Sequence, residues 1–585
     1  MDSREASRLL SPLRRSTSAT TVSELVAQQL RHFQIDPDTE FGASLARTSQ
    51  QLYELHGSVH EVWQASLKSL PQLEAADRIA RFNALKFLSF QIAKVLDTVQ
   101  NPFRASYQSL GYTPGTLAAK GPYPIFDNVT ALFSATPVIA RTATYIYACA
   151  EWVEDAFKGK ELMLEIYSRL LNPTSISLAN FVVDLEAGPY SHQYLAWNFN
   201  SGMAAIDGVL AHLLGREDIL LTSRNIYGGA YQLIHDWYAK PSNLNIAVVT
   251  FDGFSATDLQ RCLEQTLEQY AERIAAGRQL YLYLESPCNP HGDFLDLPAM
   301  CHLAHQHGIR VVLDATVGTP FLVRPLQRED ASERPDFVVH SYTKDMTGTG
   351  TAIAGCVIGR NEDMFVPKGE TVADVAWSNT LFWNVYYVKG AFLNADAAFE
   401  VIQGMRTLEM RMLPKCITTL ILANYLNAHP QIHVRSSALP TDPNANLRRK
   451  LAYLQLPAPL MTFHMSGIGR EVFQRFFDAL APTFEHMISL GQSNTIVSCP
   501  ALTTHSELSA AALHDSGIEP TTVRIAVGDE DVVDLIRHIT SVCRLVIDRD
   551  VPGFSSKFMP AEDANRMIEQ IHLQVHRDFV RSRRL

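Results

Sequence analysis

Hydrophobic residues in the middle of the chain gather in short, nearly continuous runs, and segments with helix-like spacing separate one run from the next. A strand that is apolar at almost every position is buried on both faces, as in a parallel sheet that helices cover on both sides. The pattern therefore predicts an α/β domain with a large, mostly parallel sheet. The predicted strands span residues 246–251, 279–284, 309–313, 337–340 and 353–358.

The segments on either side of this region carry a different pattern. Residues 21–110 place apolar side chains three and four positions apart, which predicts helices; the clearest series is Leu85, Leu88, Ile92, Val95 and Val99. Downstream, one long helix containing residues 395–412 is expected to lead into a smaller α+β domain. The predicted parts are a disordered tail (1–20), a helical N-terminal extension (21–135), a large domain (136–400), a small C-terminal domain (401–545) and a C-terminal tail (546–585).

Composition narrows the class of protein. The 585 residues are 46% hydrophobic and 19% charged, which is ordinary for a globular protein, and the net charge of -11 gives no sign of nucleic-acid binding. No run of 18 apolar residues occurs, so no membrane span is expected. The eight cysteines form no C-x-x-C pair, which favours reduced thiols in a cytoplasmic protein. Asp2 and Glu5 among the first twenty residues favour a disordered tail over a transit peptide.

Two polar residues end neighbouring apolar runs. Asp314 closes one predicted strand, and Lys344 follows the next by four residues. Ligands of open α/β sheets bind at the carboxyl ends of the strands, so both side chains are expected to face one crevice. A desolvated lysine can form a Schiff base, and a nearby acid can keep a pyridine nitrogen protonated. These are the two groups that pyridoxal 5′-phosphate (PLP) requires, and the hydroxyls of Ser341 and Thr343 could bind its phosphate.

The segment around Lys344 resembles the lysine segment of the Cys/Met-metabolism PLP enzymes. This family includes cystathionine γ-synthase, cystathionine lyase, methionine γ-lyase and O-acylhomoserine sulfhydrylase, and it has the aspartate-aminotransferase-like fold (fold type I). The family's motifs occur in order between about residues 136 and 545. They lie at residues 167–169, 172–174, 201–205, 227–229, 285–290, 314–316, 341–344, 404–408, 489–491 and 523–528.

The resemblance implies a cofactor site. Lys344 would carry the PLP and move protons, and Asp314 would pair with the ring nitrogen. Gly202 and Met203, at the start of a predicted helix, would offer backbone amides to the phosphate. Tyr227 would stack on the ring and assist catalysis.

The resemblance also implies substrate and subunit contacts. Asn289 would bind the cofactor's phenolic oxygen. Arg524, expected just after a short strand, would take the substrate's α-carboxylate together with Ser489. Tyr167 and Arg169 would reach the phosphate of a neighbouring subunit, which implies a homodimer or homotetramer with shared active sites.

Several positions depart from the family pattern. The family commonly has an aromatic residue after the lysine and then Gly-His-Gly-Asp, whereas this chain has Asp345 and a Gly-Thr-Gly-Thr run at 348–351. Ile488 replaces the glutamate that enzymes handling cystathionine often carry, which favours a small nucleophile such as a thiol. Gly229 replaces the cysteine that marks many methionine γ-lyases.

The resemblance and the chemistry together favour γ-replacement or γ-elimination on a sulfur amino acid or an O-activated homoserine. Alternatives are a β-lyase acting on cystathionine or cysteine, and a γ-substitution enzyme of specialised metabolism. A non-catalytic regulatory protein is disfavoured because it would not need Lys344, Asp314 and Arg524 together. The helical extension is expected to dock on the catalytic body rather than cover the entrance or bind a partner. No metal site is expected: His302, His305 and His307 lie on a predicted helix without a thiolate or paired carboxylate at ligand spacing, and positions three and five apart do not share one face well.

Overall fold

The computed structural model describes residues 19–121, 131, 133–147, 153, 154, 157, 166–500, 519 and 521–583. The chain divides into two compact units. Unit 1 comprises Met1–Val138 and Thr144–Ile166, and unit 2 comprises Ile139–Ala143 and Tyr167–Leu585. Most of the tail predicted at residues 1–20 lies outside the described residues. The domain boundaries drawn from the sequence stay a prediction.

Unit 1 is mostly helical between residues 22 and 120. Its helices are α2 (Val22–His32), α3 (Glu40–Ser69), α4 (Ala75–Ser109) and α5 (Pro114–Lys120). Thr21 and Thr39 cap α2 and α3, because their hydroxyls accept the backbone N–H groups of Glu24 and Gly42. On α4, Leu85, Ile92, Val95 and Val99 are exposed.

Unit 2 contains a seven-stranded sheet in the order β1-β7-β6-β5-β4-β2-β3. β7 runs antiparallel to both of its neighbours, and the other pairs are parallel. The prediction of a mostly parallel sheet is therefore confirmed. The strands are β1 (Tyr194–Phe199), β2 (Ile219–Ser223), β3 (Ala247–Phe251), β4 (Leu280–Glu285), β5 (Arg310–Asp314), β6 (Phe337–Ser341) and β7 (Gly355–Arg360).

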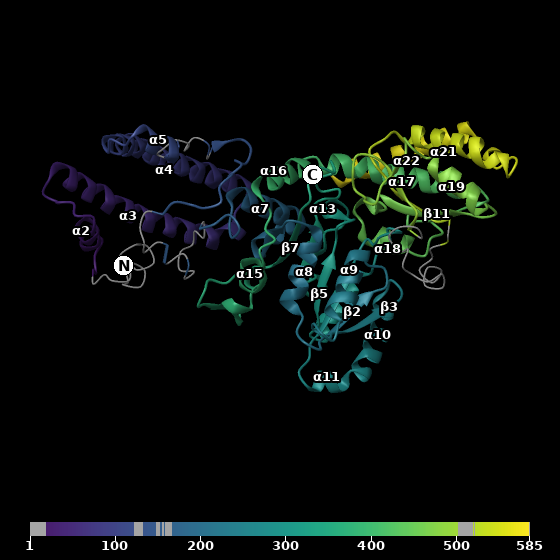
Figure 1. The fold of residues 1–585 in the computed structure, drawn as a ribbon, viewed down its shortest axis with the longest axis horizontal. Coiled ribbons are helices and arrows are strands. Elements are labelled where there is room, and N and C mark those ends of the chain that lie inside the picture. The colour runs from purple at the N-terminus through teal and green to yellow at the C-terminus, as the bar shows by residue number, and fades with distance from the viewer. Residues whose placement is uncertain are drawn as a thin grey trace. The chain divides into compact units, whose positions relative to one another are not determined.

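Helices cover both faces of this sheet (Figure 1). Val311 packs in one hydrophobic cluster with residues of α7 (Pro173–Ala187), α10 (Ala256–Gln269) and α12 (Leu297–Gln306). Its neighbour Val312 packs on the opposite side with residues of α8 (Gly202–Leu213). Successive strand residues point to opposite faces, so the unbroken apolar runs follow directly from burial on both sides.

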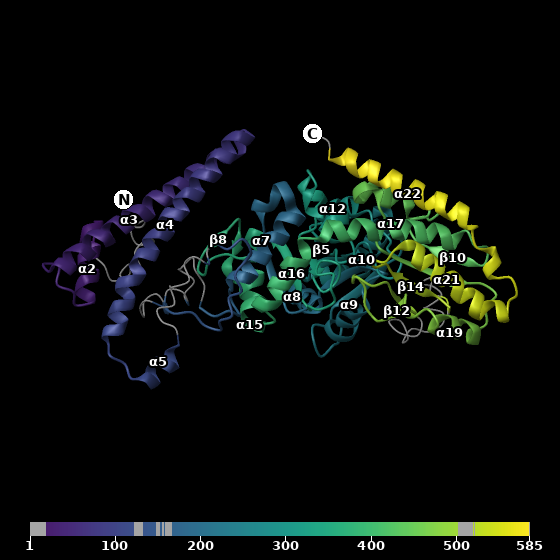
Figure 2. The same cartoon turned by 90° about the horizontal axis from the view of Figure 1, so that it is seen from above.

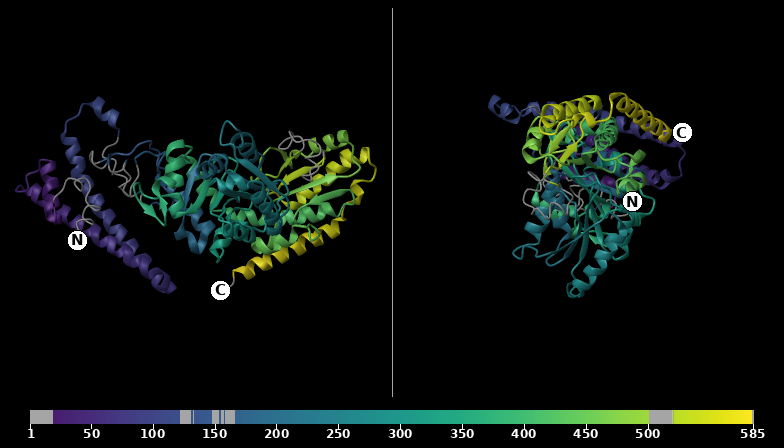
Figure 3. Two further views of the ribbon diagram at one scale, coloured as in Figure 1. Left: turned by 90° about the horizontal axis from the view of Figure 1, so that it is seen from below. Right: turned by 90° about the vertical axis from the view of Figure 1, so that its right-hand side faces the viewer.

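The smaller part of unit 2 is built on a five-stranded sheet in the order β10-β11-β14-β13-β12. Its C-terminal helix α22 (Ala561–Ser582) packs against α17 (Leu408–Asn427), and Figure 2 and Figure 3 show α22 in yellow along the outside of this part. This is the α+β arrangement that the sequence predicted. Its remaining elements are β10 (Ile432–Arg435), β11 (Leu460–Met465), β12 (Glu485–His486), β13 (Ile496–Ser498), β14 (Val523–Ala526), α19 (Arg470–Asp478) and α21 (Val532–Val546).

The single long helix predicted over residues 395–412 is wrong. Two helices occupy this stretch, α16 (Ala395–Met405) and α17, and they are separated at Thr407, whose φ and ψ are -111° and 11°. Gly404, just before the break, lies against another segment: a Cβ there would come within 2.3 Å of the Thr347 carbonyl oxygen. This close approach ties the break to the segment that carries Lys344.

Among the described residues, no helix combines the length and the apolar character that crossing a bilayer would need. No disulfide joins any two of the seven cysteines in this part of the chain, and six of the seven are buried.

Candidate active site

The carboxyl ends of β4 and β5 bring two acids together. Glu285 ends β4, Asp314 ends β5, and the two residues are register partners on adjacent parallel strands. β6 ends at Ser341, three residues before Lys344. The ends of these three adjacent parallel strands therefore lie at one edge of the sheet, the edge at which open α/β sheets bind ligands.

Lys344 is partly buried in the loop after β6. Its Nζ donates a hydrogen bond to Ser489 Oγ at 3.1 Å. Burial, followed by the positive charge of Arg524, lowers the pKa of Lys344. A lysine in this setting carries a neutral, nucleophilic amine more often than an exposed lysine does.

Arg524 is 3% exposed and lies within β14, not after a strand as the sequence suggested. Its Nη1 donates to Asn289 Oδ1 at 3.2 Å, and its Nη2 donates to the Ser489 carbonyl at 2.5 Å. Its buried Nε has no hydrogen-bond partner among the described residues. Burial lowers the pKa of Arg524 to about 10. A buried guanidinium with a spare donor is suited to a carboxylate ligand.

Glu285 organises the site, and the sequence analysis gave it no role. One carboxylate oxygen accepts the backbone N–H of Tyr227 at 2.5 Å, and the other accepts that of Asn289 at 2.8 Å. Burial, and then the charge of Asp314, raises the pKa of Glu285 well above its usual value. An acid ending an apolar strand was the signal that identified Asp314, and the same signal could have found Glu285.

Asp314 is 5% exposed, and burial raises the pKa of its carboxyl. One of its oxygens accepts the Thr316 backbone N–H at 3.0 Å. No lysine or arginine forms an ion pair with it in the part of the chain that is described. A protonated ring nitrogen at this point would supply the charge that the protein itself does not provide, so the acid fits the cofactor implied by the sequence.

Gly202 begins α8, where Ser201 caps the helix by accepting the Ala204 N–H at 3.0 Å. A Cβ at Gly202 would lie 2.6 Å from Ser341 Cβ, so the glycine lets the helix N-terminus meet the end of β6. Free N–H groups at a helix N-terminus favour an anion such as a phosphate.

The other two predicted phosphate-side residues differ in their surroundings. Thr343 Oγ1 accepts the Ala354 N–H at 3.0 Å and donates to its carbonyl at 3.3 Å, so this hydroxyl is engaged with the backbone. Met203 lies beside Gly229, since a Cβ on that glycine would sit 3.0 Å from the methionine sulfur and 2.7 Å from the Tyr227 ring. Tyr227 is 42% exposed.

Tyr167 and Arg169 lie apart from this cluster. Arg169 Nη1 donates to the Tyr387 carbonyl at 2.5 Å, and its guanidinium lies 5.6 Å from the centre of the Tyr167 ring. Tyr167 is 41% exposed. The predicted contact of this pair with a neighbouring subunit stays a prediction.

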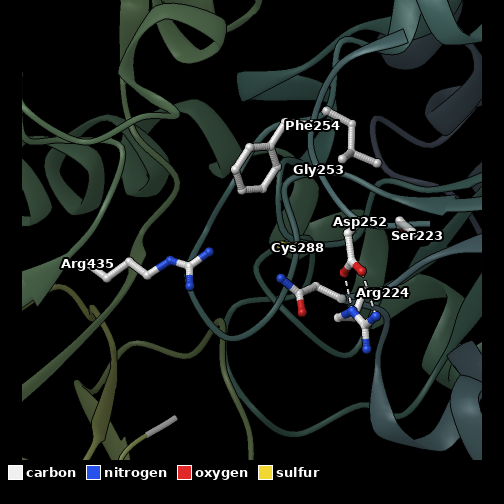
Figure 4. A pocket seen from close by; sticks show the side chains of 9 residues that line it. Ser223, Arg224, Asp252, Gly253, Phe254, Cys288 and Arg435 are labelled. Carbon is white, nitrogen blue, oxygen red and sulfur yellow. Dashed lines mark hydrogen bonds and ion pairs between the residues drawn. The ribbon is translucent and has the colours of Figure 1, made fainter. Parts of the chain in front are cut away.

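A separate cavity of about 150 Å³ lies beyond the ends of β2 and β3 (Figure 4). Arg224 and Asp252 form an ion pair on one side of it, and Arg435 extends toward it from the other. Arg435 also binds the buried carboxylate of Asp293 at 2.9 Å. Lys344, Asp314 and Arg524 are not among its lining residues, although Cys288, which lines it, directly precedes Asn289.

The histidines on α12 have structural partners. His302 Nδ1 lies 2.8 Å from Ser332 Oγ, and His305 Nε2 lies 3.0 Å from Asp336 Oδ2.

Residues 127–542 match the model of a family described as Cys/Met metabolism PLP-dependent enzymes. The chain belongs to this family. It is accordingly a PLP-dependent enzyme. The relatives that it matches are carbon–sulfur lyases or transferases. The fold and the resemblance inferred from the sequence are thereby confirmed.

Curated relatives in this family cover the catalytic part of the chain. L-Methionine gamma-lyase of Pseudomonas putida is 30% identical over 404 residues, which span 69% of this chain and 91% of the relative. O-Acetyl-L-homoserine sulfhydrylase of Corynebacterium glutamicum is 29% identical over 425 residues, with 69% and 91% covered.

Solved structures support the same family assignment. A putative O-acetylhomoserine (thiol)-lyase of Campylobacter jejuni, which contains a pyridoxyl-lysine monophosphate, matches with a TM-score of 0.61 and 28% identity over 70% of this chain and 96% of that one. Cystathionine gamma synthase of Xanthomonas oryzae pv. oryzae matches with a TM-score of 0.58 and 25% identity, covering 72% and 95%.

Proposed function

We propose that this PLP enzyme catalyses γ-replacement or γ-elimination on a sulfur amino acid or an O-activated homoserine. The hydrogen bond from Lys344 Nζ to Ser489 Oγ, next to the buried Arg524, carries the proposal. It joins an amine that can hold the cofactor to a guanidinium that can hold an amino-acid carboxylate. When bound, PLP supplies an electron sink for negative charge that develops at the substrate's Cα.

Lys344 is assigned two tasks. Its lowered pKa favours the neutral amine that holds the cofactor covalently. After the substrate's amine has replaced it, the same Nζ is free to carry protons between substrate carbons, because a base is most effective when its pKa is near the working pH. Ser489 Oγ keeps this nitrogen at the carboxylate end of the site.

Arg524 is assigned the substrate's α-carboxylate. Asn289 and the Ser489 carbonyl hold its two Nη groups, so the guanidinium plane is set before a ligand arrives. The unpartnered Nε leaves one donor available for the ligand. A planar fork of this kind orients a carboxylate better than a lysine would.

The strand ends and the N-terminus of α8 supply the residues assigned to the cofactor's ring and to its phosphate. Asp314 is assigned the ring nitrogen and Asn289 the phenolic oxygen, and Glu285 holds Asn289 and Tyr227 through their backbone N–H groups. Tyr227 would stack on the ring. Gly202, Met203 and Ser341 are assigned the phosphate, and Thr343 supports this segment through Ala354.

The substrate class is inferred from the relatives and from Ile488. The relatives named above include a methionine gamma-lyase and an O-acetylhomoserine sulfhydrylase. Ile488 is 72% exposed beside Ser489 and cannot pair with a distal ammonium group. An apolar side chain at this point favours a small thiol, or the methylthio group of methionine, over the amino-acid tail of cystathionine.

A spectral titration tests the proposal. The purified protein, reconstituted with PLP, is expected to show the visible absorption band of a lysine-bound cofactor. Lys344→Ala should abolish the band and lower kcat by about 10²- to 10⁴-fold, the range for removal of a general base. Lys450→Ala is the matched control, because Lys450 pairs with Asp296 outside the site and should leave both unchanged.

The same preparation then identifies the substrate. O-Acetylhomoserine, O-succinylhomoserine, methionine, cystathionine and cysteine are added one at a time while the band and keto-acid release are followed. Turnover of an acylated homoserine or of methionine supports γ chemistry. Release of pyruvate from cystathionine or cysteine, with no 2-oxobutanoate from any of the substrates, would replace it with β-elimination. Absence of the band after reconstitution would overturn the assignment of Lys344.

A further inference from the structure

A fully buried lysine lies directly behind the candidate active site. Lys415, on α17, is 0% exposed. Its Nζ donates to Asp345 Oδ1 at 2.9 Å and to the Gln492 carbonyl at 2.6 Å, and it lies 3.9 Å from Asp529 Oδ1. Asp345 is itself 1% exposed. The ammonium thus bridges two segments that are far apart in the sequence.

Both bridged segments carry residues of the site. Asp345 directly follows Lys344, and Gln492 lies three residues after Ser489. The segments touch closely at Gly491, whose φ is +73°: a Cβ there would come within 2.5 Å of the Asp345 nitrogen and 2.9 Å of the Lys344 carbonyl carbon. Only glycine adopts this conformation and this approach without strain.

Further hydrogen bonds join the same segments. Ser493 Oγ donates to the Gly348 carbonyl at 3.1 Å. Arg411, one turn before Lys415 on α17, donates to the Asp345 carbonyl at 2.7 Å. The helix therefore holds the lysine segment from two positions, and Lys415 also holds the Ser489 segment.

A buried ion pair is a poor device for stability alone. Two charges lose their hydration, and apolar residues of similar volume often stabilise a fold equally well or better. Asp345 also stands where related enzymes commonly have an aromatic residue, so this chain places a charge where packing alone would suffice. We infer that Asp345 and Lys415 are positioning residues, which hold Lys344 Nζ in register with Ser489 and with the carboxylate site at Arg524. This inference rests on the proposed function, because it takes Lys344 as the cofactor lysine.

Three variants test the pair. Asp345→Asn removes the negative charge, Lys415→Met removes the positive charge, and the double variant Asp345→Asn/Lys415→Gln replaces both with amides that can still hydrogen-bond. Ile421→Ala is the control: Ile421 is fully buried on the same helix, so the change lowers stability without touching the pair. For each protein the pH midpoint of the visible cofactor band, kcat, KM and the melting temperature are measured.

A positioning role predicts opposite shifts of that midpoint. Loss of the Asp345 charge moves it to lower pH, and loss of the Lys415 charge moves it to higher pH, because each leaves the other charge uncompensated beside Lys344. Both single variants should lose kcat/KM by on the order of 100-fold, the effect of a misplacement near 1 Å, mainly in kcat. The double variant should regain activity over Lys415→Met, and Ile421→Ala should change only the melting temperature.

An unchanged pH midpoint and an unchanged kcat/KM would contradict the positioning role. If the single variants lose stability as Ile421→Ala does but keep the midpoint and keep kcat/KM within about twofold, the pair is structural only and the inference is wrong. If Lys415→Met does not fold, Asp345→Asn and the double variant decide the question by the same readouts. Absence of the band in the unmodified enzyme would instead count against Lys344 as the cofactor lysine, so the two failures are distinguishable.

Discussion

Two buried carboxyl groups, Asp314 and Glu285, stand side by side at the ends of β5 and β4. They are chemically alike but differ in their partners. Glu285 accepts two backbone N–H groups, whereas Asp314 accepts one and has no cationic partner among the described residues. The difference gives Glu285 a structural task and leaves Asp314 open to a protonated ligand.

Asp314→Asn should therefore stabilise the cofactor-free enzyme but weaken its binding of PLP. Burial raises the pKa of Asp314, so its ionised form destabilises the cofactor-free fold at neutral pH, and the amide should raise that form's melting temperature. The same change should weaken PLP retention and lower kcat, because the ring nitrogen loses its counter-charge. Calorimetry with and without PLP checks both effects. A lower melting temperature of the free form would show that Asp314 already has a compensating charge.

At the scale of elements, the N-terminus of α8 meets the end of β6 through Gly202. The helix supplies free N–H groups and the strand end supplies Ser341, so their separation sets the size of the anion site. Neither element forms this site alone.

Gly202→Ala should push the N-terminus of α8 away from the end of β6. The added Cβ would lie 2.6 Å from Ser341 Cβ and 3.2 Å from Ser341 Cα, so backbone must shift. We expect faster loss of PLP on dialysis and a lower melting temperature, by a few degrees or more. Gly57→Ala is the matched control, because a Cβ there meets nothing within 4 Å and should be neutral or stabilising. Equal PLP retention in the two variants would contradict the assignment of the phosphate to this junction.

The other end of α8 carries a pH-sensitive residue. Burial, and then the charge of Arg310, lowers the pKa of His212 to about 4. The unfolded chain therefore binds the proton more tightly, and the stability that neutral His212 contributes is present above about pH 6.5 and is lost as pH falls toward 4. Relative to His212→Gln, the free energy of unfolding should fall by up to about 3 kcal/mol over that range. Denaturant titrations of both proteins at several pH values measure it, and parallel pH profiles would refute the burial of this ring.

At the scale of the whole molecule, all residues of the candidate active site belong to unit 2: Lys344, Asp314, Glu285, Asn289, Ser489 and Arg524. Tyr167 and Arg169 belong to the same unit, where the Arg169 guanidinium contacts the Tyr167 ring and Tyr387. A surface-exposed tyrosine next to an arginine suits recognition of a phosphate on another subunit, which is the role that the family resemblance assigns.

Mixed oligomers test this assignment. Arg169→Ala and Lys344→Ala should each be nearly inactive, and co-assembly of the two should restore activity, because some sites then receive an intact Arg169 and an intact Lys344 from different chains. Activity is measured after the variants are mixed, unfolded and refolded together. Light scattering checks that an oligomer forms. If mixing restores nothing although hybrids assemble, each site is complete within one chain.

Local sequence patterns were sufficient for much of this protein. The apolar runs predicted the central strands because burial on both faces of a sheet requires apolar residues at successive positions. The motifs named five residues that the structure links by hydrogen bonds and strand register, with Asp314 joined to the others through Glu285: Lys344, Asp314, Asn289, Ser489 and Arg524. The break between α16 and α17 at Thr407 was missed. Gly404, just before it, lies against Thr347, and no local pattern indicates this contact between segments far apart in the sequence.

The sequence by itself determined the family, the cofactor and five of the seven strands of the large sheet, since these depend on residue types and on their local spacing; β1 and β2 were not among the predicted strands. Only the tertiary structure decided which charged groups meet. Lys415 appears in the sequence as one of several polar residues of its helix, and nothing within several residues of it indicates Asp345 or Gln492 as its partners. Pairing depends on how the lysine loop, the Ser489 loop and α17 converge, and the free energy of a buried charge is set by those distant neighbours rather than by the local sequence.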